Sequence, residues 1–302
     1  MSAATPVPET GRRDAGDVRE QLRKTGTGRL FRDAAVRLGA ADGTSFARAI
    51  GHSSLLTLIP ALIAVIGLVV TFDLTGFQNV LEDAALSFAP GPAGRILTEA
   101  LERAEPSSGP SALLAGLAGM LISGTVGVTH LERAANRIYG VDEDRAPWRR
   151  LGLAVILAAT VEVMFMVALA VIVAGGSIGD GGDGATSDGS PWSVLRWPVG
   201  VALVTAATTV IFKVVPARRQ PGSSWLVSGT AVSVTIWVLA TVVLGLVYER
   251  ASVLGGSYGP LVGIIALLVW AYATGLAVLY GLAFAAQLEA GRAGISKPAR
   301  DP

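Results

Sequence analysis

Hydrophobic residues gather in six long segments of the chain, and shorter polar stretches separate these segments. Each one approaches or exceeds the roughly 20 residues that an α-helix needs to cross the hydrocarbon core of a bilayer. The pattern predicts transmembrane helices at residues 46–72, 111–131, 151–174, 196–215, 225–248 and 260–287. We therefore expect an all-α, polytopic membrane protein whose six-helix domain covers residues 29–290.

The charges of the connecting segments predict how these helices are oriented. Lysine and arginine near the ends of spans are retained on the cytoplasmic side. Basic residues are frequent before the first span, after the second and fourth spans and in the tail. In contrast, residues 73–110 have more acidic than basic side chains, and residues 175–190 contain no lysine or arginine. Because the two kinds of segment alternate, both termini are predicted to face the cytoplasm.

The two ends of the chain are expected to lie outside the helical domain. Residues 1–28 combine proline, glycine, serine and charges with little apolar periodicity, which predicts a disordered cytoplasmic arm, and residues 291–302 are expected to form a cytoplasmic tail. A short amphipathic helix is predicted just after the arm, from Leu30, Phe31, Ala34, Ala35 and Leu38. Two interpretations remain open for it: a helix that lies on the anionic inner leaflet, or a solvated helix.

The first external segment has an apolar periodicity of its own. Apolar residues recur at helical spacing over residues 77–88 and again over residues 96–104, on either side of Pro90-Gly91-Pro92. This pattern predicts two short amphipathic helices. They either cover a cavity or rest on lipid, and periodicity does not decide between these interpretations.

Composition limits the chemistry that this chain can perform. Of its residues 51% are hydrophobic, none is cysteine, and the two histidines are His52 and His130. Disulfides, thiolate metal sites and thiol nucleophiles are therefore excluded, and two separated histidines are too few for a histidine-rich metal site. We expect no enzyme active site, no bound metal and no cofactor.

Glu162 is the one acidic residue near the middle of a predicted span. An ionised carboxylate is costly at that depth, so it should face the helix bundle, be protonated or have a partner. One interpretation is that Glu162 moves a proton or binds a cationic group in a transporter. The other is a neutral acid that forms a hydrogen bond with a neighbouring helix.

The histidines are predicted at similar depths, near the inner ends of the first two spans. Together with Glu132 and Asn136 they form either a polar cluster at the cytoplasmic mouth or a set of ordinary interfacial residues. The sequence favours the second interpretation and leaves the first open.

Small residues at every fourth position predict close packing between helices. They occur at Ala115, Gly119, Ser123 and Gly127 in the second span, and at Ala273, Ala277, Gly281 and Ala285 in the last. We therefore expect these two helices to be central. Pro60 should bend the first span because proline lacks a backbone donor. Trp237 and Trp270 lie well inside their spans and should pack between helices or line a cavity.

Several short motifs follow one another along most of the chain, from Phe31 to Glu289. They are Thr57-Leu-Ile-Pro60, Leu131-Glu-Arg-Ala-Ala-Asn136-Arg-Ile-Tyr139-Gly, Val214-Val-Pro216, Gly229 through Trp237 to Tyr248, and Ser257-Tyr258-Gly259 followed by Trp270 and Gly281. In the order and spacing of these motifs the chain resembles the YihY/BrkB family of bacterial inner-membrane proteins, once mislabelled ribonuclease BN. The resemblance implies a six-helix bundle in the bacterial inner membrane with both ends in the cytoplasm. Tyr258 and Gly259 are candidate packing or kink residues.

The sequence also departs from that family in two places. Family members tend to have glutamate and asparagine where this chain has Ala283 and Ala285. Its first helix has Arg48 and His52 in place of small and aromatic residues. A mechanism that depends on those polar positions is therefore in doubt for this chain.

The resemblance and the helix pattern together favour a transporter or flippase for a lipid or an envelope precursor. The alternative is a non-transporting scaffold for envelope assembly, in which Glu162 is structural. A ribonuclease would need a metal-bound water or an acid–base pair beside a basic RNA groove. The chain offers only scattered interfacial bases, so we expect membrane lipids and no nucleic acid as partners.

Overall fold

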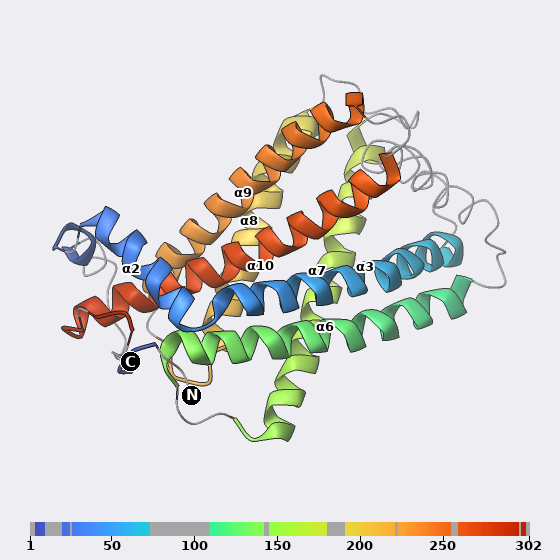
Figure 1. Ribbon diagram of the computed structural model, residues 1–302. Helices are drawn as coiled ribbons and strands as arrows, with labels where there is room; N and C mark the ends of the chain where they lie inside the picture. The colour runs from blue at the N-terminus through green and yellow to red at the C-terminus, as the bar shows by residue number, and fades with distance from the viewer. Residues whose placement is uncertain are drawn as a thin grey trace.

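The computed structural model describes residues 4–9, 20–24, 26–72, 109–141, 145–179, 191–220, 223–254, 259–295 and 297–299. Within these residues the fold is helical, with one isolated antiparallel bridge between Ala4 and Ala299. The helices are α2 (Thr27–Ala40), α3 (Gly43–Phe72), α6 (Gly109–Tyr139), α7 (Pro147–Gly179), α8 (Pro191–Val214), α9 (Ser223–Leu254) and α10 (Gly259–Arg292). Figure 1 shows that both termini lie at the same end of the bundle, close to α2.

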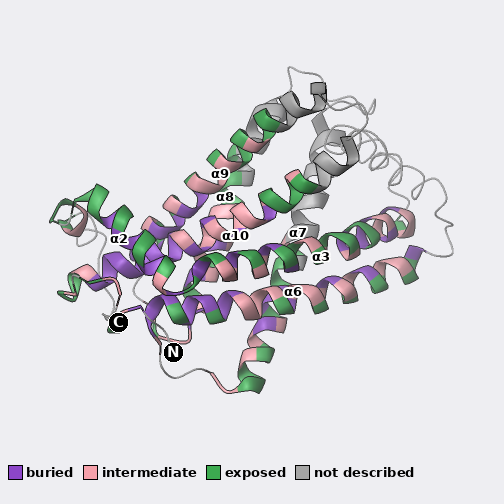
Figure 2. Cartoon of the chain, viewed as in Figure 1, coloured by how far each residue is buried: buried purple, intermediate pink, exposed green. Residues whose placement is uncertain are grey.

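Each of the six apolar segments coincides closely with one of the long helices from α3 to α10. Among the described residues, four stretches are long and apolar enough to cross a membrane, namely Gly43–Phe72, Gly109–Tyr139, Trp225–Val247 and Ile265–Arg292, and α8 adds the shorter apolar stretch Val201–Val214. Large apolar side chains remain exposed along these helices, for example Ile122 at 71% and Val163 at 63%. Figure 2 shows exposed residues on the outer sides of the helices and buried residues concentrated at the end with the termini. An apolar exterior of this kind is typical of a membrane protein with several apolar helices.

The short helices expected within residues 77–104 lie outside the described residues. The connection between α3 and α6 is therefore not part of the fold described below.

Helices α3 and α6 lie side by side, and glycines bring their backbones together (Figure 1). Gly116 lies against the backbone of Ala64, Gly67 against the backbone of Leu113, and Gly119 against the ring of Pro60. Without a hydrophobic driving force in lipid, helices depend on such close approaches for van der Waals contact. Ala115, which the four-residue spacing places in the packed ridge, is exposed, and the neighbouring Gly116 makes the contact instead.

Helix α10 touches α2, α3, α6 and α9. It packs tightly on α9 at Gly281, where an added Cβ would lie 2.6 Å from the carbonyl oxygen of Gly229. At Gly275 an added Cβ would lie 2.8 Å from the carbonyl oxygen of Ala47 in α3. Helix α7 packs against α6, and α8 packs against α9. The bundle therefore contains an α3–α6 pair and an α9–α10 pair. Helix α10 connects the two pairs because it also contacts α3 and α6.

Helix α2 uses its apolar face to contact the protein. Leu30 and Ala34 are fully buried in a cluster with Trp225, Phe284 and Leu288. The structure confirms the short amphipathic helix that the sequence predicts here. Neither interpretation from the sequence included the contact with α9 and α10, whose large apolar side chains bury part of the apolar face.

Residues 4–9 belong to the arm that the sequence predicts to be disordered, and here the structure differs. The amide of Thr5 donates to the carbonyl of Pro298 (3.2 Å), and the amide of Val7 donates to the carbonyl of Tyr139 (3.0 Å). The segment lies between the end of α6 and the C-terminal residues because its backbone groups find partners in both. The predicted limits of the arm, the helical domain and the tail otherwise remain predictions.

Candidate functional site

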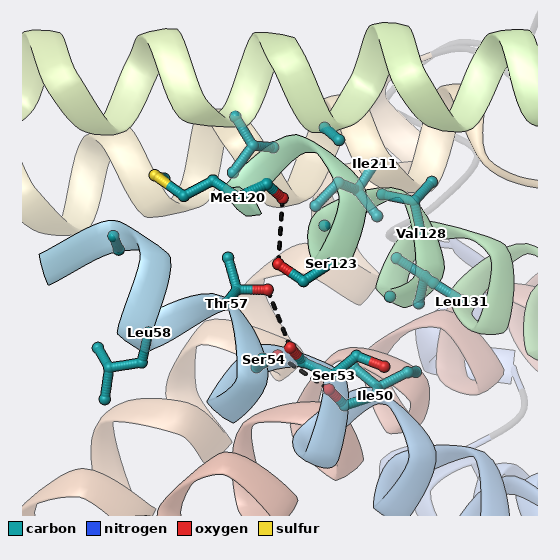
Figure 3. Close-up of a pocket in the computed structure, with 15 residues that line it drawn as sticks. Ile50, Ser53, Ser54, Thr57, Leu58, Met120, Ser123, Val128, Leu131 and Ile211 are labelled. Carbon is teal, nitrogen blue, oxygen red and sulfur yellow. Dashed lines mark hydrogen bonds between the residues drawn. The ribbon is translucent and has the colours of Figure 1, made fainter. Parts of the chain in front are cut away.

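A cavity of about 360 Å³ lies between four of the long helices. Its size is within the range of roughly 300–1,000 Å³ that is usual for small-molecule sites. The lining residues are Ile50, Ser53, Ser54, Thr57, Leu58 and Ala61 from α3, Met120, Ser123, Gly124, Gly127, Val128 and Leu131 from α6, Ala158 and Val161 from α7, and Ile211 from α8. Figure 3 shows the α3 and α6 side chains on facing walls.

Glycines of α6 leave the space for this cavity. An added Cβ at Gly127 would lie 3.5 Å from the Cβ of Ser53, and one at Gly124 would lie 3.3 Å from the Cβ of Ala158. The contact at Gly127 is an ordinary van der Waals contact and the one at Gly124 is slightly tighter, whereas Gly116 and Gly119, earlier in α6, are tightly enclosed. The α3–α6 interface is therefore closed at one part of its length and open at another.

The polar groups of the cavity wall are hydroxyls. Ser54 donates to the carbonyl of Ile50 (2.9 Å), Thr57 to that of Ser53 (2.9 Å), and Ser123 to that of Gly119 (2.8 Å) (Figure 3). Ser53 likewise donates to a carbonyl one turn back in α3, at 3.0 Å. Among the lining residues none has a charged side chain. The wall therefore suits an apolar guest.

A group of charged residues, which we call the ion cluster, lies next to the cavity along the chain. It comprises Arg37, Glu132, Arg218 and Glu289, whose side chains are buried, and Arg145, whose side chain is 26% exposed, with their hydrogen-bond partners. Glu132 directly follows Leu131 of the cavity wall. In α8, Ile211 of the cavity wall lies one turn before the carbonyls that the cluster binds. Cavity and ion cluster are thus consecutive along α6 and α8.

The first part of the ion cluster joins α6 to the end of α8. The Glu132 side chain is 1% exposed and accepts a hydrogen bond from Arg145 Nη1 at 2.8 Å. The Arg145 guanidinium also donates to three consecutive carbonyls at the end of α8, those of Val214 (3.0 Å), Val215 (2.8 Å) and Pro216 (2.9 Å). Because the last carbonyls of a helix lack intrahelical partners, Arg145 acts as a cap for α8.

The second part joins α10 to the segment after α8. Arg218 Nη2 lies 2.9 Å from a carboxylate oxygen of Glu289, and the two side chains are 4% and 1% exposed. Arg218 also donates to the carbonyls of Val7 (3.1 Å) and Pro8 (3.2 Å) and lies over the ring of Tyr139. This pair therefore holds the N-terminal segment in place as well.

The third part centres on Arg37 of α2, which is fully buried. Its guanidinium donates to Gln287 Oε1 (2.9 Å) and to the carbonyls of Thr5 (2.8 Å) and Ile138 (3.0 Å). Loss of solvent lowers the pKa of Arg37 to about 10, so the side chain still carries its charge at neutral pH. A buried cation of this kind requires all of these acceptors, because an unpaired one would be very costly.

The structure brings only part of the sequence-predicted polar cluster together. Asn136 is buried, and its Oδ1 accepts a hydrogen bond from the amide of Ala217 at 2.8 Å, beside the ion cluster. His52 is exposed on α3, and His130 is half-buried on α6. Among the described residues, no group of three His, Cys, Asp or Glu side chains could hold a metal ion.

The remaining candidates lie apart from the cavity or outside its description. Trp237 and Trp270 pack between α9 and α10 with ring centroids 6.5 Å apart, and Trp270 Nε1 donates to Thr241 at 3.1 Å. Pro60 lies within α3, which continues through it. Glu162 lies in α7 and Gly259 begins α10, but the Glu162 side chain and Tyr258 are outside the described part of the chain.

Sequence reasoning missed Arg37, Arg145, Arg218 and Glu289 as members of a buried cluster. A usable signal was present for one of them. Glu289, like Glu132, is a carboxylate at the end of an apolar segment whose neighbours are mainly basic. A lone acid in such a place requires an arginine partner when it is buried, since an unpaired buried charge is costly.

Comparisons with known proteins identify relatives of this chain. YfkH of Bacillus subtilis strain 168, named as a ribonuclease-like protein, is 24% identical over 249 residues, which cover 80% of this chain and 88% of YfkH. UPF0761 membrane protein Rru_A2625 of Rhodospirillum rubrum is 25% identical over 271 residues, covering 82% of this chain and 56% of that protein. No solved structure matches. The family model described as virulence factor BrkB matches residues 34–301, and the chain belongs to that family.

Proposed function

We propose that this protein is a six-span protein of the bacterial inner membrane, with both termini in the cytoplasm, that transports or flips a lipid or an envelope precursor. The observation that carries the proposal is the uncharged cavity between α3, α6, α7 and α8. Two of these helices, α3 and α6, are apolar enough to span a membrane, so the cavity lies at a depth where lipid is the solvent.

The orientation in this proposal is supported by two independent features. Basic segments alternate with less basic ones along the chain, and the paired Ala4 and Ala299 lie at the same end of the bundle, as an even number of spans requires. In this orientation the ion cluster closes the cytoplasmic end of the bundle beneath the cavity.

The orientation is open to a direct test with introduced cysteines, since the natural chain has none. Arg133 and Arg219 are exposed at the end with the ion cluster. Arg133→Cys and Arg219→Cys should react with a membrane-impermeant maleimide only after the membrane is permeabilised. Labelling in intact spheroplasts would overturn the proposed orientation.

Transport itself is tested in proteoliposomes that contain a phospholipid with a fluorescent headgroup. We expect the protein to speed the arrival of this lipid in the outer leaflet, where dithionite quenches it, relative to vesicles without protein. A second preparation with an isoprenoid-linked phosphate tests the envelope-precursor form of the proposal. If neither lipid moves faster than in protein-free vesicles, the transport proposal is wrong.

We propose Glu162 of α7 as the residue that carries a proton or binds a cationic group during transport. Glu162→Gln removes the titratable group with little change of shape, so a carrier role predicts slower lipid movement. An unchanged rate in the same vesicles would contradict that role and leave Glu162 as a structural residue.

A scaffold without transport is the second candidate, and the ion cluster favours it. Buried ion pairs join α2, α6, α8, α10 and residues 4–9 into one unit, as a rigid assembly platform would need. We propose no enzymatic role, no cofactor and no nucleic-acid partner. Cleavage of RNA would need an activated water or an acid–base pair in a basic groove, and the cavity wall is uncharged.

A further inference from the structure

We infer that the cavity receives a single acyl chain of a membrane phospholipid and leaves the charged headgroup outside it. The inference rests on the proposed function, because it names which part of the lipid this site holds. Three features of the wall carry it: the state of its hydroxyl groups, its opening and its size.

The hydroxyl protons of the wall are already used within the helices. Ser53, Ser54 and Thr57 donate to carbonyls one turn back in α3, and Ser123 does so in α6. These groups therefore offer oxygen lone pairs to a guest and no free donor. A phosphate needs donors or cations, and the wall supplies neither, whereas a hydrocarbon chain needs no polar partner at all.

The opening of the cavity lies on the lipid-facing side of the bundle. Leu58 and Val161 line the cavity and are also 39% and 46% exposed. They belong to α3 and α7, so the cavity is open to the surroundings of the bundle and is not fully enclosed. In the hydrocarbon region of a bilayer, the molecules that lie against such a surface are phospholipid acyl chains.

The size of the cavity limits how much of a lipid can enter. At about 360 Å³ it is near the lower end of the usual range for small-molecule sites. One flexible chain fits a narrow apolar space between helices, while a whole lipid with its headgroup does not. The ion cluster beyond Leu131 and Ile211 then limits how far the chain extends towards the cytoplasmic end.

Photocrosslinking of the purified full-length protein tests which part of the lipid enters. Two phosphatidylglycerol probes are compared, one with a diazirine at the end of an acyl chain and one with a diazirine on the headgroup. We expect the chain probe to label the peptides that contain Leu58 and Met120, and the headgroup probe to label neither. Labelling of these peptides by the headgroup probe would overturn the inference, as would their labelling by neither probe.

Variants of the wall give a second test. Gly127→Leu fills the space beside Ser53, and we expect labelling by the chain probe to fall roughly tenfold, because several methylenes lose their burial. Gly245→Leu is the matched control, since an added Cβ at Gly245 meets nothing within 4 Å and this residue is exposed on α9. Circular dichroism and gel filtration check that both variants fold.

The polar part of the wall is tested with Thr57→Val and Ser123→Ala, which remove hydroxyls at nearly constant shape. If the cavity binds an acyl chain, labelling by the chain probe should be unchanged. If these oxygens bind a lipid headgroup, labelling should fall clearly. These variants also keep the test open if Gly127→Leu does not fold. Competition with unlabelled phospholipid should abolish labelling, and competition only by an isoprenoid-linked phosphate would overturn the acyl-chain assignment.

The outcomes separate this inference from the transport proposal. If the chain probe labels the cavity, Gly127→Leu prevents it and no lipid moves in proteoliposomes, then the chain site stands and transport fails. If lipid moves in proteoliposomes but the chain probe does not label the cavity, then transport stands and the chain site is wrong.

Discussion

The cavity and the ion cluster are neighbours on α6 and α8 and yet have opposite character. Around the cavity, hydroxyls bond only within their own helix, and no charged side chain enters the wall. In the ion cluster, arginines reach across to other elements, as when Arg145 of the segment before α7 binds Glu132 of α6 and three carbonyls at the end of α8. The hydroxyls of the cavity wall form bonds within one helix, whereas the arginines of the ion cluster form bonds between elements far apart in the sequence.

This difference shows where the fold fixes the helices relative to one another. In lipid, polar bonds between helices are the specific ones, because apolar side chains contact lipid as readily as protein. The ion cluster joins α2, α6, α8, α10 and residues 4–9 at one end. We infer that this end is the fixed base of the bundle and that the helices around the cavity have more freedom to move apart.

Removal of one partner of the Arg218–Glu289 pair is the largest effect that we expect. The Arg218 side chain is only 4% exposed, and Glu289→Leu removes the carboxylate that pairs with it. Breaking a buried ion pair in this way lowers the free energy of unfolding by about 3–5 kcal/mol. Reversible unfolding by sodium dodecyl sulfate in mixed micelles measures this loss.

The double variant Arg218→Met with Glu289→Leu is the control, since it removes both charges together. It should lose less stability than Glu289→Leu alone, because an apolar pair of similar volume often replaces a buried ion pair well. Equal or greater loss in the double variant would contradict the view that the unpaired charge is the main cost. Glu20, in an exposed pair with Lys24, should be replaceable by alanine without effect.

Arg145→Lys should have the next largest effect. Lysine keeps the charge beside Glu132 but cannot present the planar fork that reaches the three α8 carbonyls, so we expect a loss of about 2 kcal/mol. Hydrogen exchange should increase at the amides around Val215, and not around the cavity. The exposed Arg149→Lys is the matched control, and equal exchange in the two variants would contradict the capping role.

The positions of the helices were predictable from the sequence because apolar runs have a length requirement in lipid. The predicted segment 46–72 lies within α3, for example, and 260–287 lies within α10. Asn136 was also placed in a polar group at the inner end. These features depend on local composition, so a single sequence contains them.

The ion cluster and the cavity were not predictable for two different physical reasons. Arg37 bonds to Gln287, 250 residues away, and in the sequence it looks like any other arginine that marks the cytoplasmic side. Gly116 and Gly127 look alike as small residues in one helix, although the first is tightly enclosed and the second lines the cavity. Only the position of α3 distinguishes them, and spacing along α6 does not give that position.

Removal of residues 1–9 tests whether the N-terminal segment belongs to the fixed base. Arg37 and Arg218 would lose their backbone acceptors at Thr5, Val7 and Pro8 but keep Gln287 and Glu289. Because water can replace part of what is lost, we expect a loss of about 1–2 kcal/mol in the same unfolding titration. Wild-type stability would show that these contacts are not part of the base.

The smallest effect is expected for Gly127→Ala, and its contrast with Gly116→Ala tests whether the α3–α6 interface really opens at the cavity. A Cβ at Gly127 meets the Cβ of Ser53 at an ordinary 3.5 Å, so the added contact should change stability by less than about 0.5 kcal/mol, apart from the gain in helix propensity. At Gly116 the added atom collides with the backbone of Ala64, and forcing the helices apart should cost about 1–3 kcal/mol. Both substitutions add the same methyl group to the same helix, so helix propensity cancels between them. Equal stability of the two variants would contradict the difference between the tight and open parts of this interface. It would also contradict the presence of space for a lipid chain between α3 and α6.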